Sequence, residues 1–338
     1  MMSKQILHIA SEIIEASKPS KPQDLLLSNM ELPFRGIFYP LGYAVEIITN
    51  EPVVLDAANE SFGHMHLSRT SAGLQVRIGI SEGSDSECPP EPIRRQYNHL
   101  YSMIGDAENQ ALLDLKSCTG FVWLNKATVN NRQFFRYNFL EKTVYLLLGS
   151  SVVTDLHAAC VSKNERGILF CGDSGAGKST LSYACARAGW TYTSDDTSYL
   201  INNSDVPRVI GHAHRVRFRP TAKALFPELG GRDLTPRLEG KPSLEIPTSE
   251  LPGLITATEA KVHSIVYLNR CPSAKGKLFP LPKETATQRL RKELYSAGEI
   301  RAKHEQILEI FSCTPTYELQ YRDLDQAIEQ LDLLAQAI

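Results

Sequence analysis

The sequence has no strong excess of charge of either sign. Its 338 residues carry 36 Lys and Arg against 38 Asp and Glu, and the isoelectric point is near 6.5. Such a balance gives no basic field that would hold nucleic acid or an anionic membrane surface nonspecifically. We therefore expect no nucleic acid and no membrane among its partners, and any polyanion has to be held by a local site.

Cysteines are few and scattered. The seven cysteines form no C-x-x-C pair, and their number is odd. A disulfide framework and a zinc site both need regular spacings, so both are disfavoured. Reduced thiols in a cytoplasmic protein are the simplest interpretation.

The chain also lacks a long hydrophobic run at its N-terminus. Charged residues, among them Lys4, Glu12 and Glu15, interrupt its first twenty residues. This pattern fits neither a signal peptide nor a membrane span, and it predicts a short amphipathic helix.

Two kinds of pattern divide the sequence. Residues 34–133 are mostly strand-like, with β-branched and aromatic residues in period-two stretches. From Arg136 onward, apolar strand-like runs alternate with helical patterns, which is typical of an α/β domain. We predict a smaller β-rich α+β domain of unknown role at residues 1–134 and an α/β domain at residues 135–338. The second ends in a charged, solvated helix over residues 284–311, an edge strand starting at Thr316, and a helix opened by Asp323 or Asp325.

The most specific motif is "GDSGAGKST", which follows the apolar run "GILF" and precedes a helical pattern. It satisfies G-x-x-x-x-G-K-[ST] in the context of a P-loop. Glycines let the loop turn with positive φ and bring backbone N–H groups against phosphate, while the lysine supplies charge and the serine hydroxyl binds Mg²⁺. The alternative is a glycine-rich turn without a ligand. The motif predicts a nucleotide site, with ATP and Mg²⁺ as cofactors, formed by Gly172, Asp173, Ser174, Gly175, Ala176, Gly177, Lys178, Ser179 and Thr180.

A P-loop also needs a carboxylate near the metal. Asp195 and Asp196 are the first acidic residues downstream, after "WTYTS". Adjacent residues of an extended chain point to opposite sides, so the two aspartates are expected to do different jobs. The pattern alone leaves open which one binds metal and which acts as base, and "SDDT" also fits a plain turn.

Other charged positions are ambiguous on their own. Residues 215, 217 and 219 are arginines that a strand would present on one face, either as an anion-binding row or as a solvated surface. His157, in the apolar run "LHAACV", is by itself more typical of a satisfied strand histidine than of a catalytic one.

Together, "LHAACV", "GILFCGDSGAGKST" and "ARAGWTYTSDD" resemble the catalytic domain of HPr kinase/phosphorylase and related kinases, over roughly residues 135–335. That family's fold is similar to that of ATP-dependent phosphoenolpyruvate carboxykinase. The resemblance implies that His157 and the pair Asp195 and Asp196 line a reaction centre, with one aspartate acting as base toward a serine hydroxyl.

The likeness is incomplete elsewhere. In "SLEIPTSELPGL", three residues match the start of the family's glycine-rich signature, but Pro247 stands where the family has arginine. This match implies Glu245 as a further metal ligand, beside Ser179 and Asp196. The first 130 or so residues show no likeness to the family's N-terminal domain, so HPr is not implied as the substrate.

The leading hypothesis is a Mg-dependent kinase that transfers the γ-phosphate of ATP to a serine-type hydroxyl of a protein, a peptide or a small molecule. Phosphorolysis, the family's reverse reaction, stays open, as does homo-oligomer formation. The alternative is a nucleotide-sensing module with little turnover, which needs Lys178 and Ser179 but no free aspartate. A carboxykinase ranks last because no additional metal-binding set is evident in the sequence.

Overall fold

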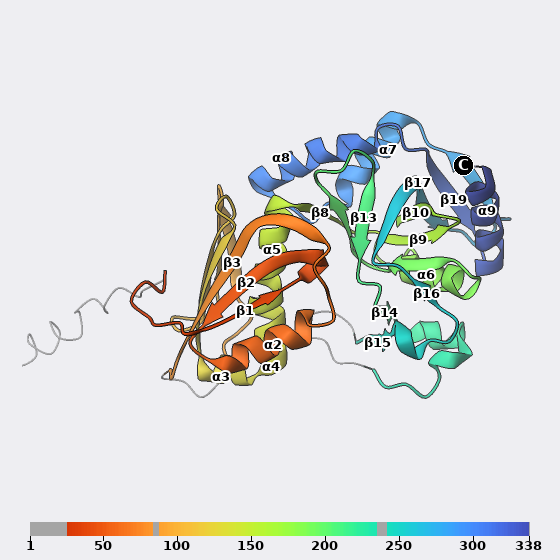
Figure 1. The fold of residues 1–338 in the computed structure, drawn as a ribbon. Coiled ribbons are helices and arrows are strands. Elements are labelled where there is room, and N and C mark those ends of the chain that lie inside the picture. The colour runs from red at the N-terminus through yellow and green to blue at the C-terminus, as the bar shows by residue number, and fades with distance from the viewer. Residues whose placement is uncertain (1–25, 84–87, 235–241, 338) are drawn as a thin grey trace, which may run out of the picture.

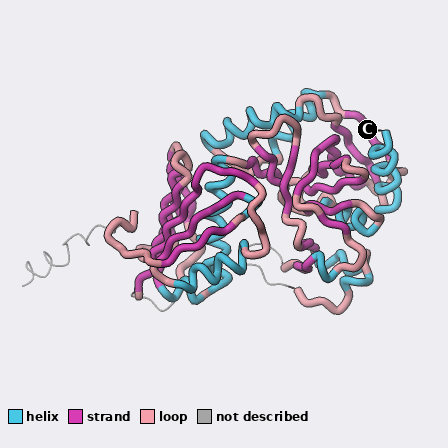
Figure 2. Tube along the Cα trace, in the orientation of Figure 1, coloured by secondary structure: helices cyan, strands magenta, loops and turns pink. Residues whose placement is uncertain are grey.

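The computed structural model describes residues 26–83, 88–234 and 242–337. Within them the chain has a mixed α/β fold with two large sheets, shown at the left and right of Figure 1 and coloured by secondary structure in Figure 2. The amphipathic helix expected over the first twenty residues lies outside the described residues. None of the described helices is long and apolar enough to cross a membrane.

The first sheet has seven strands in the order β1-β2-β3-β7-β6-β5-β4. The β2–β3 and β3–β7 pairs are parallel, and the other pairs are antiparallel. In β2, buried and half-buried residues alternate, which is the period-two signature of a strand with one face in the core. The strands are β1 (Phe34–Phe38), β2 (Tyr43–Thr49), β3 (Arg69–Ser81), β4 (Ile93–Tyr97), β5 (Leu100–Ile104), β6 (Gln110–Asp114) and β7 (Thr119–Asn125).

Helices cover the inner face of this sheet. The longest helical segment consists of α4 (Arg132–Phe135), the π-helical turn η2 (Arg136–Glu141) and α5 (Lys142–Ser151), which follow one another directly. Apolar side chains of this helical run belong to the hydrophobic core of the first sheet. The boundary expected between residues 134 and 135 therefore falls inside this run. The strand-like patterns over residues 34–133 did not indicate the other helices, which are the 3-10 turn η1 (Pro40–Gly42), α2 (Pro52–Phe62) and α3 (Lys126–Asn130).

The second sheet has ten strands, and β17 lies at its centre. β17 pairs in parallel with β10 and β19, and antiparallel with β13. The expected edge strand is β19, but it lies between β17 and β18, so that expectation was wrong. The strands are β8 (Val153–Leu156), β9 (Ala159–Lys163), β10 (Arg166–Cys171), β11 (Thr191–Ser194), β12 (Ser198–Ile201), β13 (Arg208–Gly211), β16 (Ile255–Thr256), β17 (Glu259–Arg270), β18 (Lys277–Pro280) and β19 (Thr316–Tyr321).

Helices lie on both faces of the second sheet. α6 (Lys178–Arg187) and α9 (Leu324–Ala337) bury one face, with Ile168 and Phe170 of β10. Residues from α7 (Lys283–Lys292) and the 3-10 turn η6 (Leu308–Phe311) bury the other, with Leu169 and Cys171 of the same strand. Burial on both sides explains why β10 has no polar residue after Arg166, rather than alternating polar and apolar residues.

The charged segment over residues 284–311 is not one helix, as expected, but two. α7 ends at Lys292 and α8 (Gly298–Ile307) begins after a break. Inside the break Leu294 forms a β-bridge with Leu156, and Gly298 has a φ of 57°. The buried apolar contact and the left-handed glycine oppose a continuous helix over this stretch. The break has a direct consequence for the site, because it directs Glu293 inward.

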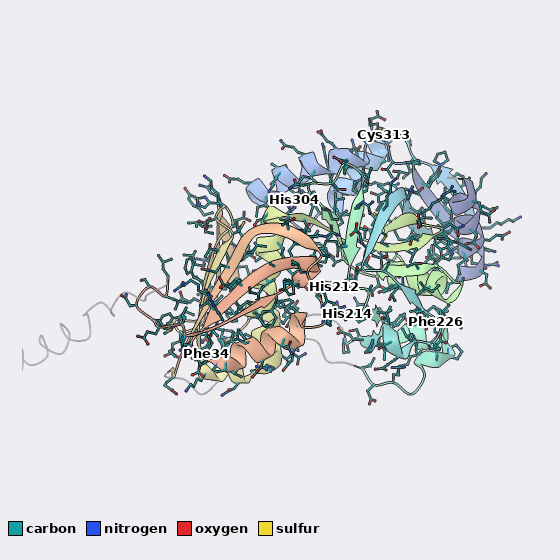
Figure 3. The ribbon with its side chains drawn as sticks, viewed as in Figure 1. Phe34, His212, His214, Phe226, His304 and Cys313 are labelled. Carbon is teal, nitrogen blue, oxygen red and sulfur yellow. The ribbon has the colours of Figure 1, made fainter. Side chains whose placement is uncertain are left out.

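A small third layer closes the second unit below α6. Strands β14 (Arg215–Phe218) and β15 (Leu244–Pro247) pair antiparallel, and Arg217 lies opposite Glu245. Their apolar residues pack with Tyr183 and Phe226, the latter labelled in Figure 3. The 3-10 turns of this part are η3 (Pro220–Ala224), η4 (Pro227–Leu229) and η5 (Thr248–Glu250).

The two sheet units touch at the start of β17 and at the turn before β14. The rings of His64 and His214 have centroids 4.0 Å apart, and Arg69 forms an ion pair with Glu259. Figure 3 labels His214 and the neighbouring His212, whose ring lies 5.7 Å from that of His214. The strand β14, which carries Arg217, therefore starts at a contact with the first unit.

Candidate functional site

A cavity of about 440 Å³ is lined by most of the site residues predicted from the sequence. It lies where the loop after β10, the start of α6 and the segment after β11 come together. Among the predicted residues, those that line it are His157, Ser174, Gly175, Gly177, Lys178, Ser179, Thr180 and Asp196. Gly172, Asp173 and Ala176 belong to the same loop, whereas Asp195 and Glu245 are not part of the lining.

The loop between β10 and α6 has the backbone that its glycines permit. Gly172, Gly175 and Gly177 have φ of 138°, 91° and 101°, which residues with a Cβ rarely adopt. Gly177 also lies against Tyr321, since a Cβ at Gly177 would be 2.9 Å from the tyrosine hydroxyl. That hydroxyl donates a hydrogen bond to the carbonyl of Ala176 at 3.2 Å. The loop is thus fixed at its end by β19 and leads directly into the N-terminus of α6.

Lys178 is buried at the first turn of α6. Its Nζ donates to the carbonyl oxygen of Gly172 at 2.6 Å, so the side chain folds back over the loop. Burial lowers the pKa of Lys178, and the nearby carboxylate of Glu293 opposes that shift. The position places an ammonium group next to the N-terminal end of a helix, where an anion is favoured.

The two aspartates after β11 have different surroundings. Asp195 is only 8% exposed, and its Oδ2 accepts a hydrogen bond from the backbone N–H of Arg217 at 2.9 Å. Burial raises the pKa of Asp195 to about 6, and the hydrogen bond with Arg217 opposes that rise. The backbone carbonyl of Asp195 accepts from the Ser179 hydroxyl at 3.2 Å. Asp195 therefore connects β14 with the start of α6 and faces the interior.

Asp196 faces the cavity, with 47% of its side chain exposed. Its Oδ1 lies 3.7 Å from Nε2 of His157, and its Oδ2 lies 3.6 Å from Nη1 of Arg217. His157 lies just past the end of β8. Burial, followed by the charge of Lys178, lowers the pKa of His157, so a neutral imidazole is favoured beside Asp196.

Glu245 lies on the other side of Arg217. Its Oε1 accepts from Nε of Arg217 at 2.9 Å, and its Oε2 lies 3.6 Å from Nη1 of Arg215. Two arginines thus engage the carboxylate, and the guanidinium of Arg217 bridges Glu245 to Asp196.

Among the residues that the structure describes, cations outnumber carboxylates on the cavity wall. The acidic lining residue in this set is Asp196, and the basic ones are Lys178, Arg217, Arg219, Arg270 and Arg322. Of the predicted arginine row, residues 217 and 219 reach the cavity and Arg215 does not. This balance favours an anionic ligand.

Two residues near the site, Tyr321 and Glu293, were not predicted from the sequence. Tyr321 contacts the last glycine of the loop, and Oε2 of Glu293 lies 4.0 Å from Nδ1 of His157. Glu293 stood in a segment whose charge density indicated a solvated helix. A signal was present in "YSAG", residues 295–298, because a serine and a glycine inside a helical pattern weaken it.

No family model and no curated protein matches the chain. Among solved structures it is similar to the Hpr(Ser) kinase/phosphatase from Coxiella burnetii, at 15% identity. The match covers 54% of this chain and 99% of that one, with a TM-score of 0.30. These values indicate no more than a distant relation.

Proposed function

We propose that the protein is an ATP-dependent kinase that transfers the γ-phosphate to a serine-type hydroxyl of a protein, a peptide or a small molecule. One observation carries the proposal. A glycine loop with a buried lysine opens into the same cavity as a solvent-accessible aspartate that is flanked by a histidine and an arginine. Phosphoryl transfer needs these two parts together, a phosphate cradle and a group that receives a hydroxyl proton.

The loop suits the phosphate groups of ATP. Around Gly175 a Cβ would meet nothing within 4 Å, so the loop backbone is open to a ligand. Backbone N–H groups and the N-terminus of α6 favour an anion there. Among the described residues, Nζ of Lys178 donates to the carbonyl oxygens of Gly172 and Asp173. A phosphate oxygen is a stronger acceptor for an ammonium group. On this proposal the lysine leaves Gly172 when the nucleotide enters.

Asp196 is the group proposed to receive the proton. The acceptor hydroxyl oxygen forms a bond to the γ-phosphorus, the bond from phosphorus to the bridging oxygen breaks, and the hydroxyl proton passes to Asp196. His157 and Arg217 hold the carboxylate from both sides. Asp195 contributes by fixing the backbone of Arg217 and the hydroxyl of Ser179.

The donor set fits Mg²⁺. Magnesium sites beside phosphates use one or two protein oxygen ligands and keep several waters, and Ser179 and Asp196 offer such oxygens on the cavity wall. The ion would neutralise charge on the phosphate oxygens. The described residues contain no group of three or more His, Cys, Asp or Glu side chains that could hold a metal on its own. Glu245 fits less well as a ligand, because Arg215 and Arg217 engage it.

The test is phosphate transfer from [γ-³²P]ATP with MgCl₂, offered to free serine, serine-containing peptides and a cell lysate. Asp196→Asn and Lys178→Ala are expected to abolish the label that the wild-type chain transfers. Matched controls are Asp205→Asn and Lys275→Ala, which remove the same charges at exposed positions outside the cavity. Unchanged transfer by Asp196→Asn would refute the role of that residue. Tight ATP binding without transfer to any acceptor would favour the alternative, a nucleotide-sensing module.

A further inference from the structure

The outer face of the first sheet, opposite its helices, carries exposed apolar side chains on β4 and β5. Ile93 lies directly opposite Ile104 in the antiparallel register, and Tyr97 lies opposite Leu100. Since side chains alternate along a strand, these four share one face. The exposed fractions are 60% for Ile93, 36% for Ile104, 77% for Tyr97 and 38% for Leu100. Contiguous exposed apolar side chains mark interaction sites on folded proteins.

The apolar surface continues toward the centre of the sheet. Leu112 of β6 and Phe121 and Trp123 of β7 are half-buried and alternate with residues of the inner core, so they point outward. Together with the four residues of β4 and β5 they form a surface over four neighbouring strands, which we call the outer patch. In Figure 1 the described helices of this unit lie on the opposite side of the sheet.

The described chain begins on this same face. Gly79 of β3 pairs with Trp123, and a Cβ at Gly79 would lie 2.5 Å from Cδ2 of Leu27 and 2.7 Å from Sδ of Met30. Leu27 is fully buried, although it does not belong to the core between the sheet and its helices. The start of the described chain therefore packs on the outer face beside the outer patch, and the residues before it are tethered there.

The sequence before residue 26 has an apolar face that suits such a surface. Its apolar residues recur with the i, i+3, i+4, i+7 spacing of one side of a helix. They are Ile6, Leu7, Ile9, Ala10, Ile13 and Ile14. The charges are complementary as well, because Arg95 lies between Ile93 and Tyr97 on the outer face, and the segment carries Glu12 and Glu15.

The lengths of chain and surface agree. A helix over residues 2–16 would be about 22 Å long. The connecting residues 17–25 can extend over about 30 Å. From β7 to β4 the outer patch crosses three strand spacings, which is about 14 Å. The segment is therefore long enough to reach and cover the outer patch of its own chain.

We propose that residues 2–16 dock as an amphipathic helix on the outer patch of the same chain. The six apolar residues of the segment then cover the cross-strand pairs of β4 and β5, and its carboxylates lie near Arg95. Docking removes both apolar surfaces from water, which is the driving force. The first sheet then has helices on both faces. This inference does not depend on the proposed function.

Hydrogen exchange of the full chain, followed by mass spectrometry, tests the proposal. Relative to their intrinsic rates, amides of residues 6–14 should exchange at least about tenfold more slowly in wild type than in Ile13→Glu, which places a charge on the apolar face. Ser11→Glu is the matched control, because Ser11 falls on the polar side of the same helical pattern, and it should keep the protection. Ile13 precedes the described residues, so its replacement leaves the described contacts of both sheets in place.

A second pair of variants changes the sheet instead. Ile93→Glu should remove the protection of residues 6–14 as completely as Ile13→Glu does. Leu333→Glu is its control, since Leu333 is a leucine of α9 in the second unit with a similar exposed fraction. If circular dichroism shows that Ile93→Glu does not fold, Tyr97→Ser takes its place.

Each outcome decides the proposal. Protection that is independent of protein concentration and lost in both isoleucine variants supports it. Protection that rises with protein concentration means that a second copy supplies the segment, which overturns docking within one chain. Unprotected amides in wild type, or protection that survives the change at Ile93 or Tyr97, also overturn it. Phosphate transfer is measured separately, so the proposed function and this inference can fail independently.

Discussion

The end of the glycine loop allows a sharp test of the backbone that the proposed phosphate site needs. We predict that Gly177→Ala destabilises the protein more than Gly175→Ala does. Both positions have positive φ, which costs a residue with a Cβ about 1–2 kcal/mol. At Gly175 the new methyl group would meet nothing within 4 Å, but at Gly177 it would lie 2.9 Å from the hydroxyl of Tyr321.

The additional cost comes from Tyr321. To make room, its buried hydroxyl has to give up its hydrogen bond to Ala176, which is worth about 1 kcal/mol. Gly177→Ala should therefore lower the free energy of unfolding by about 2–3 kcal/mol, and Gly175→Ala by about 1–2 kcal/mol. In a Tyr321→Phe background the two alanine variants should cost about the same.

The assay is equilibrium urea unfolding followed by tryptophan fluorescence. Trp190 is fully buried next to α6 and α9, and the chain has one other tryptophan, Trp123. A Trp123→Phe background therefore makes the signal specific for the second unit. Equal losses for the two alanine variants with Tyr321 present, or no coupling in the Tyr321→Phe background, would refute the contact between the loop and β19.

Two further predictions concern charges around the second sheet. Arg217→Ala should lower the rate of phosphate transfer at least about tenfold, because Asp196 loses the cation at 3.6 Å. Arg215→Ala should retain most of the wild-type rate in the same assay, because the guanidinium of Arg215 reaches Glu245 and not Asp196. Hydrogen bonds, of which the one from Gln320 has the largest effect, lower the pKa of Glu318 to about 2. The ionised carboxylate therefore stabilises the fold fully at pH values above its usual pKa of 4.5, and this stabilisation is lost as the pH falls to about 2. Glu318→Gln should accordingly lower the urea midpoint at pH 6, and this effect should shrink below pH 4.5. A constant difference between variant and wild type across that range would contradict the lowered pKa of Glu318.

Local patterns predicted the elements that local physics determines. The apolar run before the glycine loop is β10, the alanine-rich stretch after it is α6, and Asp323 caps α9 by accepting from the N–H of Gln326 at 3.1 Å. Elements that depend on tertiary contacts were not predicted. The break between α7 and α8 depends on a bridge between Leu294 and Leu156, two residues that no sequence window contains together.

In the candidate site, too, residues in local motifs were predicted and residues placed by tertiary contacts were not. The loop residues and the aspartate pair could be identified because each motif is contiguous in the chain. Which aspartate faces the cavity depends on β14, since the N–H of Arg217 holds Asp195 inward. Glu293 was missed because its burial beside His157 depends on a contact between distant parts of the chain, and the residues just before it in sequence, Arg291 and Lys292, are charged and exposed. Tyr321 was missed for a similar reason, since its contact crosses from β19 to the loop.

The helical run on the first sheet determines how the protein can be divided. Phe139, Val144 and Leu147 belong to one buried cluster together with Tyr199 and Ile210, which come from strands of the second sheet. A fragment starting at residue 135 would therefore keep α5 but leave its apolar side facing water, and we expect it to aggregate. A fragment ending at residue 134 would lose the helix that fills its sheet. The two units share part of a hydrophobic core, so mutations and shortened chains have to be studied with both units present.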